Sequence, residues 1–133
     1  MNLLLTDATA QDIQLELIRR HQYNAFDGRK VAAALLQHRD LWQAVMMDRL
    51  CFSNPGQLPR VGLIKLRDLP ANDWNVDTLY MLTPDVASAR QLEEIAETEE
   101  WAGEVRVHDD ADEVMRALGT GQTGQAIVSI WWD

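Results

Sequence analysis

The stretch that decides the fold runs from Thr78 to Trp132 and reads TLYMLTPDVASARQLEEIAETEEWAGEVRVHDDADEVMRALGTGQTGQAIVSIWW. Three of its segments, 78–82, 104–108 and 126–132, have the apolar or alternating pattern that is typical of strands. The two segments between them carry apolar residues at helical spacing. The predicted order is therefore β-α-β-α-β. Because strands joined through helices usually lie parallel, with right-handed crossovers, we expect a small, mostly parallel sheet.

Capping signals bound both predicted helices. The first is expected to begin at Thr83 and Pro84, because a hydroxyl can cap a helix and a proline at the first helical position has no N–H to lose. The second is expected to begin at Asp110, with Glu113 completing an Asp-x-x-Glu cap. Gly119 is expected to end that helix, since glycine favours the position just past a helix C-terminus.

The first fifty residues predict helices. Thr6 or Asp7 can cap a first helix, and Asp27 can cap a second. Asp40, followed three residues later by a glutamine, matches a capping box and predicts a third helix that runs on to residue 50. At this point residues 28–50 could form two helices or one kinked helix.

The expected fold class is α/β, or α+β, in which N-terminal helices precede the small parallel sheet. Residues 61–66 form a short apolar run that favours one more strand. With 133 residues, the chain is expected to be a single domain, 1–133, with a helical segment at 1–52 and an α/β segment at 60–133.

Two tryptophans end the last predicted strand. Trp131 and Trp132 are neighbours, so their side chains should point to opposite faces of the sheet. If that strand is central and both faces are covered, both indoles belong to the core. If it is an edge strand, one indole is left for a partner.

The composition favours a soluble globular protein. Apolar residues make up 47% and charged residues 25% of the chain, which is ordinary for that class. The sequence has no secretory leader pattern and no apolar run of about 20 residues, so we expect no membrane insertion. The single cysteine, Cys51, cannot form an internal disulfide, which favours a reducing cytoplasm.

Negative charge is concentrated in one stretch. From Glu93 to Glu113 there are ten acids and one base, Arg106, so the local charge is −9 and equals the formal net charge of the whole protein. Such a field repels nucleic acid and anionic lipid and attracts cationic partners. Helix capping explains some of these charges, but it does not explain why so few bases are interspersed.

Signals for catalysis and for metal binding are weak. Cys51 lies in an apolar context that suits an inert thiol, and the three histidines are far apart in the sequence. The glycine-rich segment 119–124 leads from a helix into a strand and has no lysine, unlike a phosphate loop. The aspartates after His108 lack the spacing of a calcium loop, and no zinc pattern is present. We therefore expect no catalytic residue, no metal and no cofactor.

The leading hypothesis is a non-enzymatic acidic interaction protein that binds a basic protein partner, in the manner of an inhibitor or an immunity protein. This analogy rests on charge and size alone. Trp101 would anchor the interface while the surrounding carboxylates steer the partner toward it. The expected partner-binding residues are Glu93, Glu94, Glu97, Glu99, Glu100, Trp101, Glu104, Asp109, Asp110 and Asp112.

Two further hypotheses belong to other classes. A small-molecule-binding or enzymatic domain would have a concave pocket at the carboxyl ends of the strands, near Thr83, Asp85 and residues 108–110. Self-association into a homodimer would pair the two halves of the chain, because residues 1–66 carry a net charge of +2 and residues 67–133 one of −11.

Overall fold

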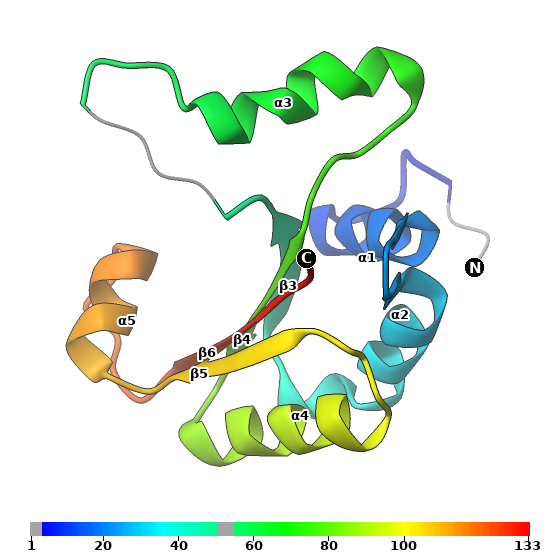
Figure 1. Cartoon of the computed structure of the whole chain (residues 1–133). Helices are drawn as coiled ribbons and strands as arrows, with labels where there is room; N and C mark the ends of the chain where they lie inside the picture. The colour runs from blue at the N-terminus through cyan, green and yellow to red at the C-terminus, as the bar shows by residue number, and fades with distance from the viewer. Residues whose placement is uncertain (1–3, 51–54) are drawn as a thin grey trace.

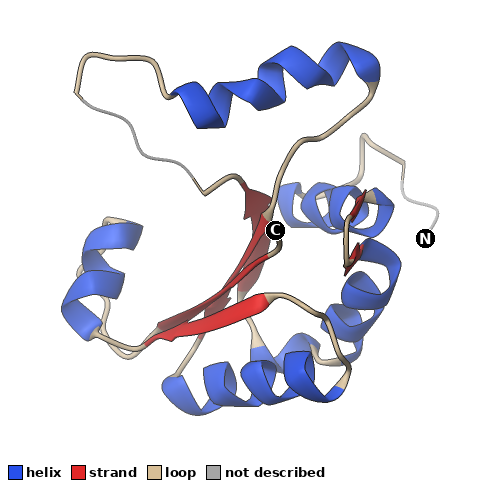
Figure 2. Cartoon of the chain, viewed as in Figure 1, coloured by secondary structure: helices blue, strands red, loops and turns tan. Residues whose placement is uncertain are grey.

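A four-stranded antiparallel sheet, covered on one face by three helices, organises the chain (Figures 1 and 2). A computed structural model describes residues 4–50 and 55–133. The elements in chain order are α1 (Ala10–Arg20), β1 (Gln22–Tyr23), β2 (Phe26–Asp27), α2 (Gly28–Gln37), the 3-10 helix η1 (Arg39–Leu41), β3 (Ala44–Asp48), α3 (Arg60–Asp68), the 3-10 helix η2 (Leu69–Ala71), β4 (Thr78–Thr83), α4 (Val86–Thr98), β5 (Glu104–His108), α5 (Ala111–Leu118) and β6 (Ala126–Trp131). Across these described ranges, no helix has both the length and the apolar character needed to cross a bilayer.

The expected parallel sheet is wrong. The strand order is β3-β4-β6-β5, and every neighbouring pair is antiparallel. The order of elements from β4 to β6 is as predicted, and β4 and β5 do run in the same direction. They are not neighbours, however, because β6 returns through α5 and lies between them. The crossover pattern predicts the direction of strands joined by a helix, but not which later strand fills the space between them, so the fold is α+β.

The predicted third helix is also wrong, because residues 44–48 form the edge strand β3. Val45 and Met47 are buried and Met46 is exposed, which is the alternation of a strand. The side-chain amide of Gln11, on α1, donates to the Val45 carbonyl (2.8 Å) and accepts from the Val45 N–H (2.9 Å). The ladder with β4 and this contact with α1 override the helical spacing of the local sequence.

The predicted strand at 61–66 is part of the helix α3. A short, mainly apolar run of six residues fits a buried strand and a short helix equally well, so periodicity cannot separate the two. η2 follows α3 directly along the chain, and none of the strands is in extensive contact with α3 in the described part of the chain. In Figure 1 it stands apart from the rest of the helices.

Three of the predicted caps are confirmed. Asp27 accepts from the Lys30 N–H at the start of α2, and Asp110 accepts from the first-turn N–H groups of α5. Gly119 ends α5 in the left-handed conformation, with a φ of 66°. These signals succeeded because each depends only on residues within one turn of the cap.

Two predicted caps lie elsewhere. α1 is capped by Thr9, not by Thr6 or Asp7, because Thr9 has an acid three residues later and forms a complete capping box. α4 is capped by Asp85, not by Thr83. The Thr83 hydroxyl is buried and lies 2.8 Å from the Asp85 carbonyl and 3.0 Å from the Ala126 carbonyl, either of which can accept its single proton.

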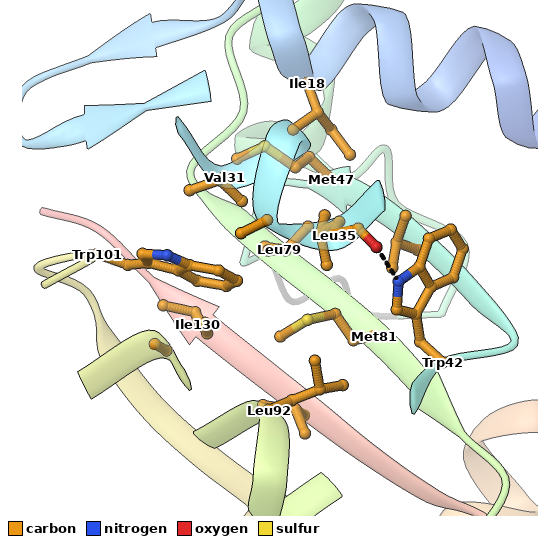
Figure 3. Close-up of a cluster of buried hydrophobic side chains, with 14 of the residues drawn as sticks. Ile18, Val31, Leu35, Trp42, Met47, Leu79, Met81, Leu92, Trp101 and Ile130 are labelled. Atoms are coloured by element: carbon orange, nitrogen blue, oxygen red, sulfur yellow. Dashed lines mark hydrogen bonds between the residues drawn. The ribbon is translucent and has the colours of Figure 1, made fainter. Parts of the chain in front are cut away.

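The core lies between the sheet and helices α1, α2 and α4 (Figure 3). The indole N–H of Trp42 donates to the Leu35 carbonyl (2.8 Å), the hydrogen bond drawn in Figure 3. Trp132 is 1% exposed, and its ring contacts that of Phe26 at 4.6 Å between centroids. Trp131 points to the other face and is only half-buried. β6 lies between β4 and β5 and is a central strand. Of the two neighbouring indoles, however, only that of Trp132 belongs to the core, since the second face of the sheet is incompletely covered.

Candidate functional site

The face of the sheet opposite α1, α2 and α4 is the open face. Because side chains alternate along a strand, every second residue of each strand points to it. Its residues are Ala44, Met46 and Asp48 of β3, Thr78, Tyr80 and Leu82 of β4, Ile127, Ser129 and Trp131 of β6, and Glu104, Arg106 and His108 of β5. α5 stands beside one end of this face and α3 beside the other (Figure 1).

A groove of about 490 Å³ lies between the open face and α5, and its lining is mainly apolar. Met46, Leu82 and Ile127 contribute to its floor from three neighbouring strands. Val114 and Leu118 contribute to its wall from α5. Met46 is 47% and Leu118 is 39% exposed, so apolar surface in the groove is open to solvent.

The local sequence of α5 holds this wall in place. Asp110 Oδ1 accepts from the N–H groups of Asp112 (3.0 Å) and Glu113 (3.3 Å), which fixes the start of the helix. Val114 is 3% exposed, whereas Leu118, one turn further on, is only partly covered. The apolar side of this helix therefore faces the groove, while its acidic first turn lies at the rim.

One edge of the groove is polar. His108 Nε2 lies 2.7 Å from Ser129 Oγ, and His108 Nδ1 lies 3.7 Å from Glu113 Oε1. Carboxylate, imidazole and hydroxyl thus lie in the order used by serine nucleophiles. The backbone around Ser129 belongs to the ladders of β6 with β4 and β5, so its N–H groups are not free to stabilise an oxyanion. This edge can hold or move a proton, but it lacks the oxyanion donors that acyl transfer needs.

Sequence reasoning did not find the contact between His108 and Ser129, which are 21 residues apart. The available signal was strand parity, because residues two apart on a strand share a face. In the register of β5 with β6, His108 is opposite Ile127, so Ser129 is its diagonal neighbour on the open face. That signal needed β5 and β6 to be recognised as antiparallel neighbours.

Arg90 joins two parts of the predicted acidic stretch. Its guanidinium lies 3.3 Å from both Glu93 Oε1 and Asp109 Oδ2, so one side of α4 lies next to the connection between β5 and α5. Glu94 and Glu97 are exposed further along α4. We define the acidic surface as Glu93, Glu94 and Glu97 of α4 together with Asp109, Asp110 and Asp112 at the start of α5.

Three predicted partner-binding acids lie outside the acidic surface. Glu99 and Glu100 follow the C-terminal end of α4, where Glu100 has a positive φ of 56° and its carbonyl accepts from Lys30 Nζ (3.5 Å). Glu104 points to the open face and pairs with Arg106 at 3.6 Å. The predicted residues are thus divided between the two sides of the sheet.

Trp101, the predicted interface anchor, is 2% exposed and belongs to the core, so its side chain does not lie on the surface. Its carbonyl accepts a hydrogen bond from the indole N–H of Trp132 (2.7 Å). Its own indole N–H is buried and meets no acceptor among the described residues. A tryptophan among glutamates looked like an exposed anchor because the sequence does not show that the chain turns inward at the end of α4.

Thr83 and Asp85, named in the pocket hypothesis, form the cap of α4. The Thr83 hydroxyl donates to the Asp85 carbonyl (2.8 Å), and the Asp85 carboxylate accepts from the Ser88 N–H (2.7 Å). The hydrogen bonds from Ser88 lower the pKa of Asp85 below its ordinary value. Neither residue lines the groove, whereas His108 does.

Comparisons of the chain with models of protein families, with curated proteins and with solved structures found no match. Within the described residues, the acids and histidines also form no cluster of three or more that could hold a metal ion. Function is therefore argued from the two surfaces described above, the acidic surface and the groove.

Proposed function

We propose that the protein is a non-enzymatic interaction protein that binds a basic protein partner through the acidic surface. The double contact of Arg90 with Glu93 and Asp109 supports this most, because it brings an acid of α4 next to the acidic segment that precedes α5. In the described ranges, Glu94 and Glu97 take part in no ion pair, so their charges are available to attract cations.

The proposed mechanism is electrostatic steering followed by steric blockade of the partner, as in inhibitors and immunity proteins. Its support is the net charge of −9 and the exposure of most acids of the acidic surface, five of which are exposed and one, Glu93, partly so. The same charges argue against nucleic acid and anionic lipid as partners. The single cysteine supports a cytoplasmic setting for this binding.

The test begins with basic proteins captured on the immobilised chain at low salt and identified by mass spectrometry. The association rate of each purified captured protein is then measured against ionic strength. We expect the association rate to fall steeply as salt is added, because screening near 0.15 M limits the range of attraction between exposed charges to about 8 Å. Substituting glutamine at Glu93, Glu94 and Glu97 is expected to slow association by about tenfold.

The matched control neutralises three exposed acids elsewhere, Asp7→Asn, Asp40→Asn and Asp73→Asn. It removes the same net charge, but none of it from the acidic surface. Equal losses in the two triple variants would show that only overall charge matters. A rate that does not change with ionic strength would exclude the proposal.

The groove supports a second candidate function, the binding of a small apolar molecule. The supporting observation is a concave, mainly apolar cavity with His108 at its edge. It ranks second because the polar atoms at that edge are already paired with one another. A thermal-shift screen of apolar carboxylic acids, amines and esters tests it, with the variant Ala117→Glu as the control that fills the groove.

A further inference from the structure

α3 carries apolar surface that the rest of the chain does not cover. Leu66 is 66% and Leu63 is 38% exposed, and Leu69 just after the helix is 54% exposed. Spaced three apart, they form one stripe along the helix. Monomeric proteins expose single apolar residues freely, but a contiguous stripe marks an interaction site.

The groove is a second uncovered apolar surface on the same side of the sheet. Its wall is α5 at one end of the open face, and α3 stands beside the other end (Figure 1). Lys65 of α3 forms an ion pair with Asp48, which belongs to the open face at the end away from α5. α3 is therefore held away from the groove of its own chain, with its leucines outward.

The two surfaces are complementary in charge. The sequence of α3, residues 60–68, has three bases and one acid, whereas residues 109–118 have four acids and one base. Glu113, which lines the groove, places part of that negative charge at its rim. Arg67 donates to both carboxylate oxygens of Asp68 (2.7 and 2.8 Å), yet its own side chain is 67% exposed, so it stays accessible to the acids of a second copy.

We propose that the protein forms a two-fold homodimer in which α3 of each copy docks into the groove of the other. Two open faces turned toward each other place α3 of one copy opposite α5 of the other. Each chain supplies one helix and one groove, so a single two-fold contact fills both grooves and leaves neither site free to form a fibre. This proposal uses a surface other than the acidic surface and goes beyond the proposed function.

The first experiment is sedimentation velocity of the full chain from about 1 to about 200 μM, where a weak but specific dimer is detectable. We expect the wild type to dimerise in this range. The double variant Leu63→Glu and Leu66→Glu should weaken the dimer by at least about tenfold. Because both side chains are exposed, its unfolding midpoint should match that of the wild type at a concentration where both are monomeric.

The matched control is Ile13→Glu with Leu36→Glu. These two apolar side chains lie on α1 and α2 and are 40% and 45% exposed, respectively. This control should dimerise like the wild type. Ala117→Glu, in the groove, should weaken the dimer as the α3 variant does. A wild type that stays monomeric throughout, or a dimer that survives both the α3 and the groove substitutions, would overturn the proposal.

Disulfide trapping distinguishes docking between chains from docking within one chain. Leu66→Cys chains are mixed with Ala117→Cys chains, each also carrying Cys51→Ser, so that a covalent heterodimer forms only if α3 of one copy reaches the groove of another. A single chain with both cysteines that closes on itself as a monomer would overturn the proposal. The glutamine variant at Glu93, Glu94 and Glu97 should still dimerise, which separates this proposal from the acidic surface.

Discussion

The two faces of the sheet use the same four strands and have opposite surroundings. On the covered face, Leu79, Met81, Val128 and Ile130 are fully buried under α1, α2 and α4. On the open face, the alternate residues of those strands are half-buried or exposed, except the buried Thr78, and they mix apolar with polar groups. The covered face supplies the core, whereas the open face keeps apolar surface that stability alone does not require.

This difference teaches where to look for function. Residues buried in the core tolerate few substitutions, and changes there mainly alter packing and stability. The open face holds the groove, the contact of His108 with Ser129 and the acidic first turn of α5. A binding surface in this protein is therefore more reasonably sought on one side of the sheet and along its β5 edge than in the core.

The largest expected effect comes from two isoleucines on β6 that point to opposite faces. Ile130→Ala should lower the free energy of unfolding by about 2–5 kcal/mol, because the side chain is fully buried and leaves a cavity. Ile127→Ala, on the open face, should cost about 1 kcal/mol or less. Urea unfolding of both variants measures the difference. Equal losses would mean that the open face is covered as well as the core.

The two neighbouring indoles sharpen the same contrast. Trp132→Phe removes the donor to the buried Trp101 carbonyl, which should cost about 1–3 kcal/mol. Trp131→Phe loses a longer hydrogen bond, 3.3 Å to Asp77, at a half-buried position, and should cost less. Thermal and urea unfolding compare them. Trp101→Phe is an internal control, since it removes an indole N–H that has no acceptor within the described residues.

A third comparison concerns the wall of the groove. Asp110→Ala removes the side-chain cap of α5 and should cost about 1 kcal/mol, with faster amide hydrogen exchange confined to that helix. Asp112→Ala removes an acid from the same first turn without removing the cap, so it serves as the control. If exchange also rises throughout the sheet, α5 is part of the cooperative core and not a separate wall.

The smallest expected effect is a pH-dependent loss of stability at His21, on the covered side of the sheet. His21 is 8% exposed among Phe26 and Trp74, and burial lowers its pKa below the ordinary value of 6.5, although a hydrogen bond to the Val76 carbonyl opposes the shift. Protons therefore favour the unfolded chain once the pH falls below about 6.5, so this stability is complete above that pH and is lost toward the lowered folded pKa.

Unfolding in urea at pH 7.5 and at pH 5.5 (roughly one unit either side of the histidine pKa) measures this loss. His21→Gln should remove it, and the half-buried His38→Gln should leave it in place. The carboxyl of Glu16, whose pKa is lowered to about 2 by hydrogen bonds from Arg19 and then Arg20, contributes stability that is lost only below its ordinary value of 4.5. It does not interfere at these two pH values.

Local signals were sufficient for much of the fold. The strands at 78–82, 104–108 and 126–132 and the caps at Asp27 and Asp110 are all present, because each follows from residues close together in the chain. The predicted sheet topology was wrong because nothing in the sequences of β4 and β5 indicates that β6 will lie between them. The strand at Val45 was missed because its stability comes from β4 and from Gln11 on α1.

The site was less predictable than the fold. The acids could be located, but their division between two sides of the sheet depends on the alternation of β5 and on the position of α4. Trp101 was misplaced because burial of a single indole is a property of the assembled core. The groove was foreseen only in part: a pocket was expected near His108, but its floor comes from three strands and its wall from a helix that are brought together only by the topology.

The position of β6 has a consequence for the nascent protein. A ribosome makes β4 and β5 before β6, yet β6 must enter between them and form hydrogen bonds with both. Until it does, two strand edges face a gap that another chain's strand could fill. During synthesis this molecule is therefore most exposed to mispairing just before its central strand emerges, and a chaperone acting on it would be most useful at that moment.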